Sequence, residues 1–215
     1  MVRLPLVLLI VLLAAAPAGA AFSGLTLIPT ADVLAGGQVC LDYQVDGPFP
    51  LASGVDAALL NTQCGIGTHL EAGMDLDFSA EAPAGALFNG KVLVPTERMG
   101  FALALGSHNI GEGLKATTYV VATKELRALR LHAGAQRSSE ATDGFGGVDY
   151  ALSDRLQLWA ERLAGDENAS AVTLAYQLTE RWGISLAWQH PNSREADDSY
   201  SLHVGCALPS HSAGE

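Results

Sequence analysis

The chain has 215 residues, and 12 Lys and Arg against 23 Asp and Glu give it a formal net charge of −11. This acidic balance argues against a nucleic-acid-binding protein, because such a protein needs a basic face to neutralise phosphates. Only 16% of the residues are charged and 49% are hydrophobic, so the chain is not expected to be disordered. Three cysteines are too few for a disulfide scaffold or a cysteine-rich zinc module.

The first twenty residues are predicted to be a secretory signal peptide. A short basic start, residues 1–3, precedes an almost wholly apolar run over residues 4–16, and small residues follow up to Ala20. This order predicts cleavage after Ala20. An uncleaved anchor helix is the alternative, but the apolar run is shorter than the ~20 residues that a span requires. No later apolar stretch approaches that length, so the exported protein is either soluble or a membrane β-barrel.

The rest of the chain alternates with a period of two residues. Over residues 70–78 the even positions are apolar and the odd positions are charged or Gly, and residues 129–136 and 200–208 repeat this pattern. Such alternation predicts strands with one apolar and one polar face. Twelve segments are predicted: 37–46, 56–66, 69–79, 85–94, 100–108, 114–123, 127–137, 145–152, 156–164, 170–178, 182–190 and 199–208.

Short and long connections alternate between these segments. Turns of two to five residues follow every second strand, whereas longer polar loops, such as 46–55, 138–144 and 191–198, join the other pairs. This order is typical of an up-and-down antiparallel transmembrane β-barrel. We therefore predict an all-β barrel of about twelve strands over residues 37–208. An N-terminal segment, 21–36, precedes it, and a polar C-terminal tail, 209–215, follows it.

One turn motif occurs twice. Ser153, Asp154 and Arg155 lie between two predicted strands, and residues 179–181 repeat the order of hydroxyl, acid and Arg. The hydroxyl and the acid are expected to accept hydrogen bonds from local backbone amides in a tight turn.

The direction of the apolar face separates two fold hypotheses. A soluble periplasmic β-barrel or sandwich that binds a small apolar ligand would turn large apolar residues inward. Here the other face is rich in Gly, Ala and charged residues, which favours a polar lumen and lipid outside. Aromatic residues near strand ends would suit the membrane interfaces: Phe78, Phe101, Tyr150, Tyr176, Trp182 and Trp188.

Residues 24–37 carry a family resemblance. They follow the pattern G-L-x-x-I-P-T-A-x-V-L-x-x-G, which resembles the start of YjbH-like barrels and of uncharacterised single-barrel outer-membrane proteins. YjbH-like barrels are associated with exopolysaccharide secretion, so the resemblance implies a bacterial outer-membrane location and a link to envelope polysaccharide export. The residues themselves suggest a segment that runs from the periplasm into the first strand, with Pro29 preventing premature strand pairing.

The predicted lumen is rich in ionisable side chains. Acids on the first three strands should pair there with basic residues and histidines, because buried charges need partners. Two interpretations remain open, an ion-pair network that fills the barrel and a narrow polar pore for small solutes. The predicted lumen-facing residues are Asp42, Glu71, Asp75, Asp77, Lys91, Arg130, His132, Asp149, Glu161 and His203.

No catalytic residue, metal site or cofactor is predicted. Residues 107–109 and 190–193 contain Ser, His and Asn, but neighbours in a strand rarely point at one another, so an outer-membrane hydrolase is only a third alternative. The predicted partners are outer-membrane lipid, the outer-membrane assembly machinery, and small solutes or polysaccharide. Cys40 and Cys64 lie on neighbouring strands, and a disulfide between them stays open.

Overall fold

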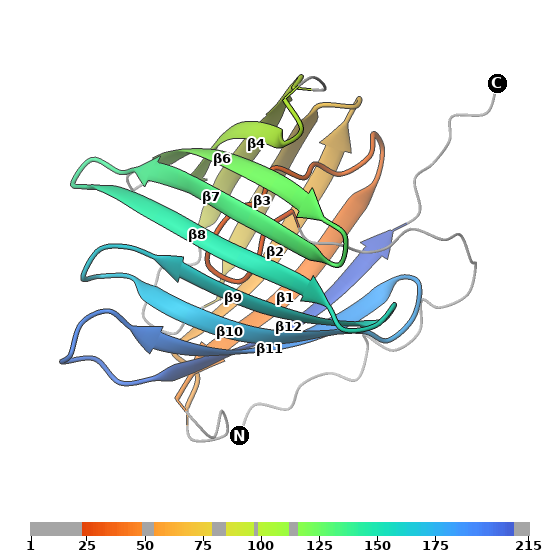
Figure 1. Cartoon of the computed structure of the whole chain (residues 1–215). Coiled ribbons are helices and arrows are strands. Elements are labelled where there is room, and N and C mark those ends of the chain that lie inside the picture. The colour runs from red at the N-terminus through yellow and green to blue at the C-terminus, as the bar shows by residue number, and fades with distance from the viewer. Residues whose placement is uncertain (1–22, 49–53, 79–84, 97–98, 112–115, 209–215) are drawn as a thin grey trace.

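The computed structural model describes residues 23–48, 54–78, 85–96, 99–111 and 116–208. It contains twelve antiparallel strands (Figure 1). They are β1 (Val39–Gly47), β2 (Ala57–Ile66), β3 (Leu70–Asp77), β4 (Ala86–Val94), β5 (Ala102–Ile110), β6 (Thr117–Leu126), β7 (Leu129–Arg137), β8 (Thr142–Ala151), β9 (Leu156–Leu163), β10 (Ala169–Gln177), β11 (Trp182–Pro191) and β12 (Ser199–Leu208). The predicted signal peptide and polar tail lie outside the described residues.

The strands close into a barrel in which each strand pairs with its neighbours in the sequence. The seam joins the first strand to the last, and β1 pairs with β12 from Val39 opposite Leu208 to Gly47 opposite Tyr200. The predicted fold class, an all-β up-and-down barrel of twelve strands, is therefore confirmed. The described part of the chain holds no helix with the length and apolarity needed to cross a membrane.

The two faces of the sheet have opposite character. On β11 the side chains of Ile184, Leu186 and Trp188 point outward and are 36%, 49% and 41% exposed, whereas Ser185 and Ala187 between them are buried. Leu186 lies beside Leu174 of β10 in the register, so the outer apolar surface continues from strand to strand. A soluble barrel for an apolar ligand needs the reverse arrangement, and the structure does not fit that alternative.

Most strand boundaries lie within two residues of the predicted ones, and the larger differences are in β6 and β8. Strand β6 runs on to Leu126, because Lys124 and Glu125 continue the ladder opposite Leu131 and Arg130 of β7. The turn is therefore the pair that follows, and Arg127 adopts a positive φ of 59° there. Strand β8 begins at Thr142, three residues before the predicted start. Polar residues at strand ends carry little periodic signal, which explains both errors.

In the repeated turn motif the hydroxyl acts as expected, whereas no described backbone amide donates to the acid. Ser153 Oγ accepts hydrogen bonds from the amides of Arg155 and Leu156, at 3.3 and 3.1 Å. Thr179 Oγ1 does the same for the amides of Arg181 and Trp182, at 3.2 and 3.1 Å. The hydroxyl thus satisfies two backbone donors in each turn between β8 and β9 and between β10 and β11.

The register of β1 and β2 places Cys40 and Cys64 on different faces. Cys40 lies opposite Gln63 and is buried, whereas Cys64 lies opposite Val39. Directly opposed residues share a face of the sheet, so Cys64 lies on the same face as Val39. Successive residues of a strand point to opposite faces, so Cys40 lies on the other face from Cys64. The disulfide considered from the sequence does not form, and the three cysteines are free.

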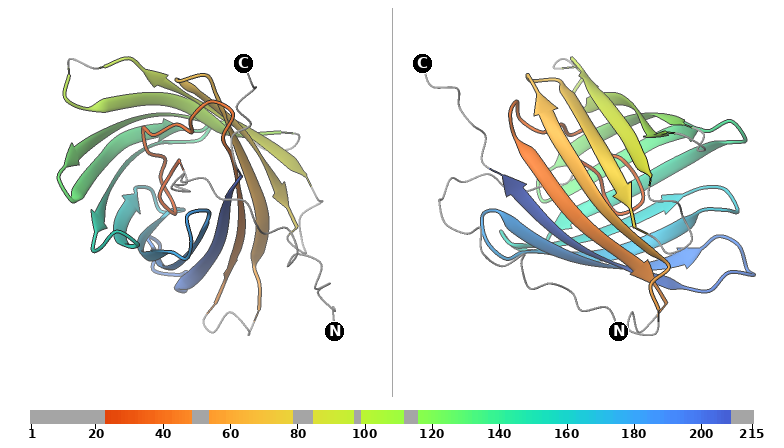
Figure 2. Two further views of the ribbon diagram at one scale, coloured as in Figure 1. Left: turned by 90° about the vertical axis from the view of Figure 1, so that its right-hand side faces the viewer. Right: turned by 180° about the vertical axis from the view of Figure 1, so that it is seen from behind.

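The N-terminal segment does not simply lead into β1 from one end of the barrel. Its described part, residues 23–36, folds back inside the ring of strands (Figure 2, left, red to orange). A tight turn brings Gly24 opposite Pro29, and the amide of Leu25 donates to the carbonyl oxygen of Ile28 at 2.9 Å. Pro29 therefore belongs to a turn inside the lumen, and the segment reaches β1 only after crossing part of the barrel.

Candidate functional site

The lumen holds the N-terminal segment through its backbone. The amides of Thr26, Leu27 and Ile28 all donate to the Glu161 carboxylate on β9, at 2.9, 2.9 and 3.0 Å. Glu161 is only 5% exposed. Three successive amides that converge on one anion form a strong, charge-assisted cradle. This carboxylate is therefore balanced by backbone dipoles, and it needs no cationic side chain.

A second anchor lies on β3 and β4. The amide of Leu34 donates to Glu71 at 2.9 Å, and the Ser23 hydroxyl also donates to this carboxylate. Lys91 Nζ donates to the carbonyl oxygens of Ser23 and Thr30, at 2.7 and 3.2 Å, and lies 3.9 Å from Glu71. Both charged side chains are buried. The ion pair on β3 and β4 thus holds the segment near both of its ends, at Ser23 and Leu34, and the acid on β9 holds residues 26–28 between them.

A hydrogen-bond chain holds the middle of the segment. The amide of Ala31 donates to Thr123 Oγ1, whose hydroxyl is 2.9 Å from His132 Nδ1. His132 Nε2 is 2.9 Å from Asp149. An ionised carboxylate only accepts, so His132 donates to Asp149 through Nε2, and in the neutral tautomer with this proton Nδ1 accepts from the Thr123 hydroxyl. Every donor along this buried chain therefore has an acceptor.

Arg130 joins the segment to the same network. Its Nη2 donates to Asp32 at 2.6 Å, and its Nη1 lies 3.4 Å from Asp149. Burial alone would raise the pKa of Asp32, but the hydrogen bond and charge of Arg130, together with the hydroxyl of Thr30, lower this pKa below its ordinary value of 3.8. Asp32 is therefore ionised at neutral pH and binds Arg130 as a charged partner.

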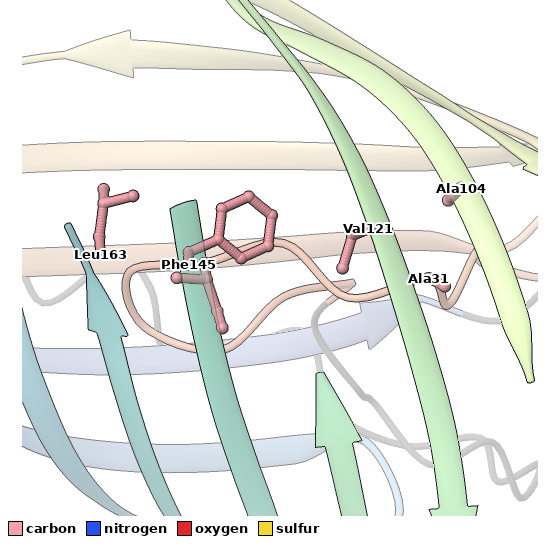
Figure 3. Packing of buried hydrophobic residues seen from close by; sticks show 6 residues of the cluster. Ala31, Ala104, Val121, Phe145 and Leu163 are labelled. Atoms are coloured by element: carbon pink, nitrogen blue, oxygen red, sulfur yellow. The ribbon is translucent and has the colours of Figure 1, made fainter. Parts of the chain in front are cut away.

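Apolar contacts complete the docking. Two side chains of the segment enter a small buried cluster with residues of the barrel wall (Figure 3). The cluster consists of Ile28, Ala31, Ala104, Val121, Phe145 and Leu163. We call the surface that receives the segment the docking wall, defined by Glu71, Lys91, Thr123, Arg130 and Glu161.

The other side of the lumen is hollow. A cavity of about 460 Å³ lies between the segment and the strands from β8 through β12 to β1. We call its far side the open wall, defined by Asp42, Gln44, Gln177, Ser185 and His203. Three charged residues of the short turns also line the cavity: Asp154, Arg155 and Glu180. The segment therefore narrows the lumen and leaves polar space beside it.

Three residues at the seam have the connectivity of a hydrolase triad. Ser201 Oγ is 2.9 Å from His203 Nε2, and His203 Nδ1 is 2.8 Å from Asp42. A serine nucleophile must be reachable by a substrate carbonyl carbon. Ser201 is 0% exposed, so this geometry gives no open reaction site. The three side chains instead link β12 to β1 inside the barrel.

The clusters considered from the sequence for catalysis do not assemble. Ser107 donates to the carbonyl oxygen of Thr117, and His190 is 2.7 Å from Asp198. No hydrogen bond between Ser and His forms within either cluster in the described parts of the chain. Nor do the described residues contain a group of three or more His, Cys, Asp or Glu placed to hold a metal.

The ten side chains predicted for the lumen fall into distinct groups. Six of them bind the N-terminal segment or support those that do: Glu71, Lys91, Arg130, His132, Asp149 and Glu161. Asp42 meets His203, while Asp75 accepts a hydrogen bond from Asn89 at 3.1 Å and Asp77 ends β3.

Two of the expected pairings form, and two differ. Glu71 meets Lys91 and Asp42 meets His203, as pairing of buried charges requires. Arg130 meets Asp32 and Asp149, and His132 meets Asp149, rather than an acid of the first three strands. The sequence prediction missed the backbone amides of the segment as partners. The excess of lumen acids over Lys91 and Arg130 was the signal that other donors were needed.

Comparisons with known proteins agree with this architecture. No family model matches the chain, and no curated protein matches it. Among solved structures, it is similar to a KdgM porin with a TM-score of 0.66 and 12% identity, over 79% of this chain and 99% of that one. A KdgM porin in complex with disordered oligogalacturonate gives a TM-score of 0.62 and 12% identity, over 80% and 99% of the two chains. At these identities the likeness shows a shared fold, and neither neighbour is a YjbH-like barrel.

Proposed function

We propose that this chain is a non-enzymatic barrel of the bacterial outer membrane, and that its lumen passes small hydrophilic solutes. The outward face supports the membrane location, because apolar side chains that are a third to a half exposed follow neighbouring strands. A soluble protein rarely exposes so continuous an apolar surface. Tyr150, Tyr176 and Trp188 are exposed near strand ends, where the membrane interfaces would lie.

The observation that carries the pore function is the cavity beside the docked segment. Side chains alone fill narrow barrels, whereas here an ordered segment occupies one side and polar residues line about 460 Å³ on the other. Porins with the same fold support this reading. The passage would be narrow, so it suits small solutes.

A sugar polymer is a finer hypothesis for the solute. One neighbour of the same fold was solved with oligogalacturonate, and the resemblance of residues 24–37 also suggests envelope polysaccharide. An extended polymer would have to pass the segment, which is held at Glu161, Glu71 and Arg130. We therefore expect monosaccharides to enter protein-containing liposomes in swelling assays, and we expect entry to fall steeply with chain length.

A second candidate is a closed structural barrel with no passage. The number of contacts that fix the segment favours it, since a plugged lumen is one of the known forms of outer-membrane barrels. Planar bilayer recordings separate the two functions. The full exported chain, shown to be folded by a heat-dependent shift in gel mobility, should give small current steps. Folded protein that gives no steps would contradict the pore and favour the closed barrel.

A further inference from the structure

The charged groups of the lumen are unevenly distributed. On β1 and β3 the interior carries Asp42, Asp46 and Asp75, and within the described part of the lumen these two strands bring no Lys or Arg to that face. The two basic side chains that the strands turn inward, Lys91 and Arg130, are both engaged with the N-terminal segment. These three acids therefore have no Lys or Arg partner among the described contacts.

The described contacts of these acids are with amide side chains, and Asp42 also lies 2.8 Å from the imidazole Nδ1 of His203. Asp46 accepts from Gln44 Nε2 at 2.8 Å through one oxygen, and its other oxygen is buried without a hydrogen-bond partner. Asp75 accepts from Asn89, and Asp42 accepts from Asn61 at 3.3 Å. Amides orient a carboxylate but leave its negative charge in place. The field of this wall is therefore negative.

The charged side chains that line the cavity beside the segment are also mostly negative. Five carboxylates line it against two guanidinium groups: Asp32, Asp42, Asp149, Asp154 and Glu180 against Arg130 and Arg155. Arg130 is shared by two of these acids. A cleft of one sign with low-dielectric walls concentrates counter-ions and repels ions of its own sign.

We propose that the lumen selects cations and rejects acidic solutes, an inference that rests on the pore function proposed above. The solute class is a small cation or a neutral polar molecule. A polyanion such as the oligogalacturonate of the neighbouring structure would meet like charges on β1, on β3 and at the cavity rim. Rings and walls of Asp and Glu side chains are a general means of cation selection in pores.

The test is the ratio of potassium to chloride permeability, measured from reversal potentials in bilayers with a KCl gradient. We expect a ratio of about ten or more, in line with the enrichment of counter-ions in charged clefts. The double variant Asp46→Asn, Asp75→Asn removes two charges and keeps side-chain size, and its ratio should fall about threefold. A linear polyamine should reduce the current, and oligogalacturonate should not.

The matched control removes two charges outside the lumen. Asp166→Asn with Glu167→Gln changes two exposed carboxylates in the turn between β9 and β10, where salt screens their field. Its permeability ratio should equal that of the unchanged protein. Current steps with anion preference, or an equal change in both double variants, would overturn the selectivity alone. Folded protein without current would overturn the pore function itself, and with it the selectivity.

Discussion

The docking wall and the open wall are built from the same alternating strands, yet they treat their carboxylates differently. Glu161 and Glu71 on the docking wall receive backbone amides from the N-terminal segment. Asp42 on the open wall, and Asp75 beyond it, meet an imidazole and an amide side chain. The pattern of a strand thus decides which way an acid points, and the path of a distant segment decides whether that acid is neutralised.

The largest expected effect comes from removing the cradled acid of the docking wall. Glu161→Ala deletes the acceptor of three successive amides, each worth about 1.5–3 kcal/mol as a bond to a charged group. Hydrogen exchange at Thr26–Ile28 should accelerate by about a hundredfold or more, and single-channel conductance should rise. Glu167→Ala, an exposed acid, is the control. Unchanged exchange at these amides would show that Glu161 does not hold the segment.

A smaller effect is expected at Asp32 and Arg130, because both side chains are partly exposed to water. Their side chains are 40% and 27% exposed, so the pair should contribute about 1 kcal/mol. Asp32→Asn should therefore accelerate exchange in the segment by about fivefold. A double-mutant cycle with Arg130→Gln measures the coupling, and additive effects of the two changes would contradict a direct pair.

Acid should weaken this contact. The pKa of Asp32 is lowered in the folded barrel, so its stabilisation is fully present above the ordinary value of 3.8 and is lost as the pH falls through the lower folded value. The difference in segment exchange between the unchanged protein and Asp32→Asn should be constant at neutral pH and should vanish in strong acid. A difference in exchange that grew on acidification would contradict the lowered pKa of Asp32.

The smallest effect is expected away from both walls, in the short turns. Thr179→Ala removes the acceptor of two backbone amides, which should lower the free energy of unfolding by about 0.5–1.5 kcal/mol. Urea unfolding of the refolded barrel measures this change, and the permeability ratio should not move. Glu167→Gln, at an exposed acid outside the cavity, is the control. A loss of ion selectivity in Thr179→Ala would show that turns and lumen are coupled.

Much of the fold could be predicted because the strands alternate clearly. Leu70–Asp77 places each acid on one face and each large apolar residue on the other. The face of this strand that points into the lumen could therefore be predicted. Strand β6 was misplaced because Thr117 and Thr118 suit either face, and because Lys124 and Glu125 resemble a turn although they continue the ladder.

The candidate site was predictable only in part. Side-chain patterns indicated that Glu71 and Glu161 point inward, but they cannot reveal that backbone amides of residues 26–34 are their partners. The same limit applies to Cys40 and Cys64, whose faces depend on a register that weak alternation in β2 did not fix. Main-chain contacts between residues far apart in the sequence do not depend on side-chain type, so they produce no periodic pattern in the sequence.

The position of Glu161 also has a consequence for the order of assembly. The amides of Thr26 and Leu27 lie 135 and 134 positions before the acid that binds them. Because synthesis runs from the N-terminus, the segment is made first and Glu161, which binds it, is made much later. The contacts with Glu71 and Lys91 need only the first four strands, whereas residues 26–28 can bind Glu161 only once the ninth strand exists, so the seating of the segment is completed late in assembly.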